Sequence, residues 1–106
     1  MITRVKINEI ANKIARNYNP DKIILFGSYA NGEPNDSSDI DLLIIKKSSK
    51  PRHKRGNEVW KHLYGAMVPI DLIVYTPEEI KKEKDNKYSF IYTVLKSGQM
   101  LYEREK

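Results

Sequence analysis

The chain of 106 residues contains no cysteine, so disulfide bonds and thiolate metal sites are excluded. No apolar run approaches the roughly 18 residues that a membrane-spanning helix needs, and the first residues lack the apolar region of a secretory signal. Linkers, repeats and low-complexity tracts are also absent. We therefore expect a soluble, cytoplasmic protein without a membrane partner, built as one domain over residues 1–106.

The hydrophobic residues, 40% of the chain, follow the pattern of a small α/β (α+β) domain. Short, β-branched apolar runs over residues 23–26, 40–45 and 70–75 predict buried strands. Helical spacing predicts an amphipathic helix from residue 4 to about residue 18, with a core face of Ile7, Ile10, Ala11, Ile14 and Tyr18. The expected architecture is a small mixed β-sheet packed against helices.

Two more helical stripes and one helix start complete the predicted elements. Thr76-Pro77-Glu78-Glu79 predicts a start capped by Thr76, with Glu79 reaching back. A stripe before the third strand is interpreted as core, with a partner surface as the alternative; it consists of Val59, Trp60, Leu63, Tyr64 and Met67. The last helix is expected to end at Gly98, and its stripe is Tyr88, Ile91, Tyr92 and Leu95.

Three aspartates lie among the aliphatic residues of the predicted strands: Asp39, Asp41 and Asp71. Because side chains alternate along a strand, Asp39 and Asp41 should point the same way, roughly 7 Å apart. Two unit charges at that distance repel by roughly 2 kcal/mol, so either their pKa values rise or a cation binds. Oxygen ligands with room for water and phosphate favour Mg²⁺, and two ions about 3.5 to 4 Å apart would serve in-line displacement at phosphorus.

Gly27-Ser28 stands between the first predicted strand and a short stretch that is compatible with a helix, Tyr29-Ala30-Asn31. Glycine lets the backbone approach a ligand closely, the hydroxyl of Ser28 adds a donor, and a helix start favours an anion. Gly-Ser alone is an ordinary turn, and a lone Asp-x-Asp is common in loops. Their combination with a later acid on a strand indicates a site for phosphate chemistry.

These residues resemble the minimal nucleotidyltransferase (MNT) domain of the DNA polymerase β-like superfamily. The stretches that carry the resemblance are 25–33 and 38–44, and residues 94–103 are similar to the helix and short strand that end such domains. The resemblance implies the polymerase β-like nucleotidyltransferase fold over nearly the whole chain.

The resemblance also implies roles for the residues. Gly27 and Ser28 would hold the triphosphate of ATP, and Asp39 and Asp41 would coordinate Mg²⁺, with two ions expected. Asp71 would complete the metal site and help to deprotonate the acceptor hydroxyl. Relatives often carry arginine where this chain has Asn31, which cannot offer a positive charge to phosphate; the departure concerns phosphate affinity or nucleotide selectivity rather than the metal ligands.

Small MNT proteins often accompany a HEPN protein in toxin-antitoxin pairs, so the resemblance implies an antitoxin that transfers AMP to a tyrosine of a HEPN ribonuclease toxin. Two alternatives stay open: nucleotidyl transfer to a small molecule or to a nucleic-acid end, and a non-catalytic module that neutralises a toxin by binding it.

The net charge of +5 includes a basic cluster after the second predicted strand. We interpret this cluster as a solvated loop and the exposed first turns of a helix. It could instead attract nucleic acid or steer ATP or an acidic partner, although no aromatic residues are interleaved for base stacking. Direct nucleic-acid binding therefore stays open for these residues: Lys46, Lys47, Lys50, Arg52, Lys54 and Arg55.

Overall fold

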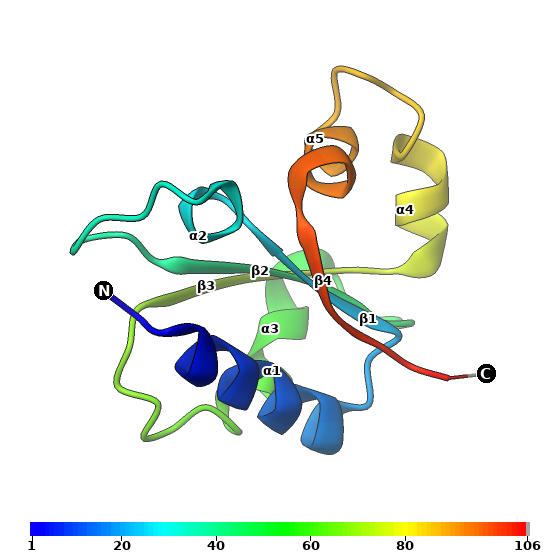
Figure 1. The fold of residues 1–106 in the computed structure, drawn as a ribbon. Helices are drawn as coiled ribbons and strands as arrows, with labels where there is room; N and C mark the ends of the chain where they lie inside the picture. Colours follow the sequence, from blue (N-terminus) through cyan, green and yellow to red (C-terminus); the bar gives the residue numbers. More distant parts are fainter. Residues whose placement is uncertain (106) are drawn as a thin grey trace.

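The computed structural model describes residues 1–105 and contains a four-stranded mixed sheet with helices on both faces (Figure 1). This architecture confirms the predicted fold class. Along the chain the elements are α1 (Arg4–Tyr18), β1 (Lys22–Phe26), α2 (Ser28–Asn31), β2 (Ile40–Ile45), α3 (Arg52–Trp60), β3 (Ile70–Tyr75), α4 (Pro77–Glu83), α5 (Phe90–Ser97) and β4 (Gln99–Glu103).

The strands lie in the order β3-β2-β1-β4, and only the pair β2 and β3 is parallel. Parallel strands begin at the same end of a sheet, whereas β1 is antiparallel to β2 and therefore ends where β2 begins. The register places Phe26 opposite Asp41, and Asp41 opposite Asp71. The end of β1 and the starts of β2 and β3 thus meet at one edge of the molecule.

Each face of the sheet has its own hydrophobic core. Ile23 and Leu25 of β1 point to the face that α1 and α3 cover, and Ile24 points to the face that α5 covers (Figure 1). The core residues predicted for α1 are all buried, and the helix runs from residue 4 to residue 18 as predicted. Because both faces are covered, the strands read as continuous apolar runs rather than alternating ones.

The stripe after β2 does not form one helix to residue 67, so that prediction was wrong. α3 ends at Trp60, and the next residues follow turns in which Gly65 and Met67 have positive φ angles of 86° and 57°. Only Val59 and Leu63 of the stripe join the core, while Trp60, Tyr64 and Met67 are 42%, 84% and 94% exposed.

The stripe of the last helix also differs in part from the prediction. Tyr88 lies before α5 and is exposed, and the buried residues of the helix are Ile91 and Val94. α5 does end at Gly98, but this glycine does not adopt the left-handed conformation expected of such a cap. Glycine is favoured there because a side chain would not fit: a Cβ would lie 2.7 Å from Ile24 Cγ2.

Arg55 is buried, which corrects the interpretation of the whole basic cluster as solvent-exposed. Its guanidinium donates hydrogen bonds to the carbonyl of Lys50 (2.8 Å), the carbonyl of Val74 (3.1 Å) and the carboxylate of Glu79 (2.6 Å). Glu79 also completes the predicted capping box with Thr76 at the start of α4. The pair of Arg55 and Glu79 therefore ties α3, β3 and α4 together.

The pKa of Glu79 reflects these contacts. Burial alone would raise it, but hydrogen bonds from Arg55, from the backbone N–H of Thr76 and from Arg52, together with the charge of Arg52, lower the pKa to about 2. The ordinary value is 4.5. The ionised form is thus favoured in the folded protein.

We expect Glu79→Gln to lower the free energy of unfolding by about 2 kcal/mol at neutral pH, because it removes the charged partner of a buried guanidinium. Since folding lowers the pKa of Glu79, its contribution is present above pH 4.5 and is lost as the pH falls toward about 2. Urea unfolding of wild type and variant should therefore converge over this range. Glu78→Gln, at an exposed neighbour, is the control; a constant difference between Glu79→Gln and wild type would contradict the assignment.

Candidate functional site

The three predicted acids lie at the edge where β2 and β3 begin. Asp41 and Asp71 are register partners on these strands, and Asp39 precedes the first residue of β2. Asp41 is half-buried, whereas Asp39 and Asp71 are exposed. The structure therefore places two carboxylates on neighbouring strands and the third two residues away along the chain.

The electrostatics of Asp41 show that the acids act on one another. Burial raises the pKa of Asp41, and the negative charges of Asp71 and then Asp39 raise it further. Like charges in this arrangement disfavour the ionised form unless a cation offsets them. The site thus holds unbalanced negative charge at the sheet edge.

Gly27 brings the turn after β1 into contact with this acid. Its φ of +74° is a conformation that L side chains rarely adopt, and a Cβ added there would overlap Asp41 Oδ2 and lie 3.1 Å from Asp41 Cγ. Ser28 then begins α2, in which the N–H groups of Ala30 and Asn31 donate to the carbonyl of Gly27. Glycine suits this position because of its backbone conformation, and because the carboxylate of Asp41 occupies the space of a side chain.

The donor set of the site fits a hard divalent cation. Within residues 1–105, no three Asp, Glu, His or Cys side chains stand close enough together to form a complete metal site. Mg²⁺ does not need such a cage, because it is usually held by one or two carboxylates together with waters and substrate phosphates. Asp41 and Asp71, with Asp39 beside them, are the residues that could hold it.

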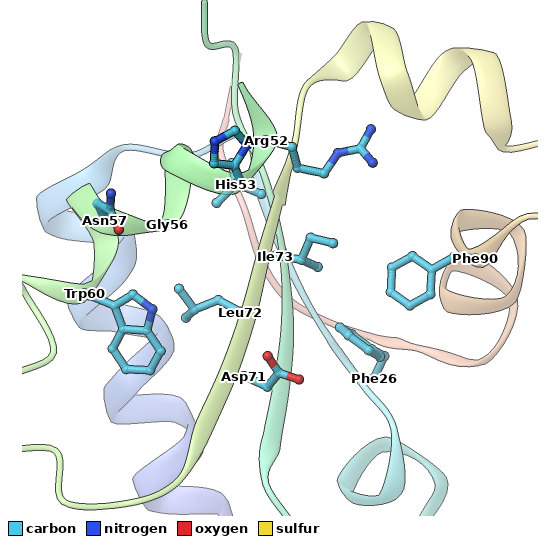
Figure 2. A pocket seen from close by; sticks show the side chains of 11 residues that line it. Phe26, Arg52, His53, Gly56, Asn57, Trp60, Asp71, Leu72, Ile73 and Phe90 are labelled. Carbon is cyan, nitrogen blue, oxygen red and sulfur yellow. The ribbon is translucent and has the colours of Figure 1, made fainter. Parts of the chain in front are cut away.

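A cavity of about 690 Å³ lies beside the acids, at the outer edge of β3 (Figure 2). In Figure 2, Trp60 of α3 and Leu72 lie on one side of β3, and Phe26, Ile73 and Phe90 on the other. Asp71 is part of the lining. The sequence did not predict this cavity, because its walls come from α3, β1, β3 and α5; the only signal was the alternative that the stripe containing Trp60 is a partner surface.

Comparisons with known proteins agree on one family. The profile described as polymerase beta, nucleotidyltransferase matches residues 8–106. Two proteins of Methanocaldococcus jannaschii that carry the provisional name protein adenylyltransferase are similar to this chain. One is 38% identical, covering 91% of this chain and 94% of the relative. The other is 30% identical, covering 93% and 71%.

A solved structure from Sulfolobus solfataricus, provisionally named a nucleotidyltransferase, has a similar fold. Its TM-score is 0.66 at 26% sequence identity, and the match covers 96% of this chain and 81% of that one. The mixed sheet and its flanking helices are thus a nucleotidyltransferase fold.

We expect Asp71→Asn to lower the pKa of Asp41 in the metal-free protein, because the substitution removes a neighbouring negative charge. Burial, the larger cause of the raised pKa, would remain. Carboxyl ¹³C NMR titration measures the change directly. Asp85→Asn, in the exposed connection between α4 and α5, should leave the titration of Asp41 as it is. If the pKa of Asp41 is the same in Asp71→Asn and in the wild type, the two carboxylates do not interact.

We expect Gly27→Ala to destabilise the protein more than Gly32→Ala. Gly32 also has a positive φ, +76°, but nothing lies within 4 Å of its Cβ position, so its substitution reports left-handed strain of roughly 1 to 2 kcal/mol. Gly27→Ala adds the overlap with Asp41, and its φ of 74° with a ψ of −155° is a conformation that is essentially restricted to glycine. Urea unfolding should therefore show a smaller cost of Gly27→Ala in an Asp41→Ala background. Equal costs in both backgrounds would mean that the contact is absent.

Proposed function

This chain belongs to the polymerase beta nucleotidyltransferase family, as a minimal nucleotidyltransferase, and we propose that it moves AMP from ATP to a hydroxyl of another protein. The observation that carries the proposal is the contact between the Gly27 turn and Asp41, with Asp71 on the neighbouring strand. The names of the relatives from M. jannaschii support a protein as the acceptor. Residues 1–106 would act as one domain.

We assign phosphate binding to the turn after β1 and metal binding to the three acids. Gly27 and Ser28 would hold the triphosphate, since their turn lies against Asp41. Asp39, Asp41 and Asp71 would hold Mg²⁺, and we expect two ions. When bound, the metal would neutralise charge on the phosphates and on the entering and leaving oxygens. Asn31, exposed at the end of α2, offers phosphate a neutral amide in place of a cation.

The reaction is an in-line displacement at the α-phosphorus. The acceptor oxygen forms a bond to that phosphorus, the bond from the phosphorus to the oxygen that bridges to the β-phosphate breaks, and pyrophosphate leaves with the electron pair. The proton of the acceptor hydroxyl passes to the carboxylate of Asp71, which is exposed and borders the cavity. Asp71 would thus act as general base.

The acceptor that we propose is a tyrosine of a HEPN ribonuclease toxin, which would make this chain an antitoxin. An adenylyl group on a tyrosine near a ribonuclease site would block the site by its bulk and negative charge. None of the helices in residues 1–105 is long and apolar enough to cross a membrane.

We expect a HEPN protein encoded beside this chain to gain adenylyl-sized mass increments when the two are incubated with ATP and Mg²⁺. Asp39→Asn and Asp41→Asn should each slow the transfer by about 100-fold or more, since metal-assisted charge stabilisation contributes several kcal/mol. Intact-mass spectrometry measures the transfer, and Asp85→Asn is the matched control.

Three outcomes would contradict the proposal. The HEPN protein gains no mass, the Asp39→Asn and Asp41→Asn variants transfer AMP like the wild type, or transfer goes to a sugar hydroxyl or a tRNA end instead. If the two Asn variants still neutralise the toxin, this chain acts on the toxin by binding alone.

A further inference from the structure

The outer edge of β3 is open over its first half. β3 is the outermost strand, and the carbonyls of Pro69 and Tyr75 accept hydrogen bonds from β2 and the residue that follows it. The backbone N–H and C=O groups of successive residues point to opposite sides of a strand. Those of Ile70, Leu72 and Val74 therefore point away from β2, toward the outer edge. The carbonyl of Val74 accepts a hydrogen bond from the guanidinium of Arg55. Among residues 1–105, no strand pairs with the remaining outward groups.

The 690 Å³ cavity runs along this open edge and reaches both faces of the sheet. Figure 2 shows Trp60 and Leu72 to one side of β3, and Ile73, Phe26 and Phe90 to the other. An added strand sends alternate side chains to opposite faces. A chain segment laid along β3 would therefore place successive side chains into the two halves of the same cavity, which combine these apolar residues with the polar side chains of Arg52, His53, Asn57 and Asp71.

The half on the acid side suits an aromatic ring with a hydroxyl. Phe26 and Phe90 form an edge-to-face pair with ring centroids 5.3 Å apart, and both line the cavity with Ile73. Asp71 lines this cavity and Asp41 does not. Asp41 and Asp71 are register partners on one face of the sheet, with Asp41 against the turn at Gly27 and Asp71 at the cavity.

The surface beside the cavity is that of a protein contact rather than of a small-molecule pocket. Trp60 also lines a second hollow of about 410 Å³, whose walls include Tyr64 and Met67. These two side chains are 84% and 94% exposed. Large exposed apolar side chains that continue from a site mark interaction surfaces.

We infer that the acceptor is a tyrosine-bearing segment of a partner protein that pairs with the open edge of β3 as an added strand. Its tyrosine ring lies against Phe26, Ile73 and Phe90, with the hydroxyl at Asp71, and a neighbouring side chain packs on Trp60. Main-chain pairing supplies affinity and the two halves of the cavity supply selectivity. The inference rests on the proposed transfer of AMP to a protein.

Steady-state kinetics with the HEPN protein as acceptor test the cavity. We expect Trp60→Ala and Phe90→Ala each to raise the KM for the acceptor by about tenfold and to leave the KM for ATP unchanged. Tyr88→Ala, at a side chain that is 93% exposed and outside the cavity, should change neither. A raised KM for ATP with an unchanged KM for the acceptor would assign the cavity to the nucleotide base and overturn the inference.

Backbone hydrogen exchange of the wild-type chain tests the edge without relying on variants. We expect the N–H of Leu72 to become protected when the HEPN protein binds. Transfer of AMP with protection only outside β3 would overturn the docking surface and keep the proposed function. Protection of Leu72 without transfer would keep the docking surface and overturn the proposed function. If the HEPN protein does not bind, both fail.

Discussion

Repulsion among Asp39, Asp41 and Asp71 is the constraint around which the site is arranged, and the buried sheet is what holds the carboxylates together against it. Burial raises the pKa of Asp41, the negative charges of Asp71 and then Asp39 raise it further, and the strands keep these carboxylates near one another. They cannot move, because β1, β2 and β3 carry core residues on both faces, with Ile40, Leu42 and Leu43 fully buried. Held together in this way, the carboxylates would suit the cation and the phosphates of the proposed reaction.

Two contacts extend that constraint to the rest of the molecule. Gly27 packs directly against the carboxylate of Asp41, so the positions of the turn after β1 and of this acid depend on each other. The contact therefore couples the proposed phosphate-binding turn to the proposed metal ligands. Arg55 of α3 donates to the carbonyl of Val74 in β3 and pairs with Glu79 at the start of α4, so that it joins the three elements. Since α3 forms one wall of the cavity, this ion pair supports the proposed acceptor surface as well as the fold.

The helices and strands could be predicted where local pattern decides them. α1 and the capping box at Thr76 follow the prediction because spacing and capping are properties of neighbouring residues. The end of α3 could not be predicted in this way, since apolar spacing continues to Met67 although the backbone turns away after Trp60. Arg55 looked like one more exposed cation, because the glutamate that pairs with it lies 24 positions later.

From the sequence alone came the candidate residues of the site, the strands that carry Asp41 and Asp71, and the glycine turn before them, because a carboxylate within an apolar run is costly unless a ligand binds it. Only the tertiary structure decided that Gly27 contacts Asp41, that Asp71 borders a cavity while Asp41 does not, and that Trp60 faces this cavity rather than the core. The reason is physical: these relations depend on strand register and on where a helix stops, and both are settled by packing between segments far apart in the chain.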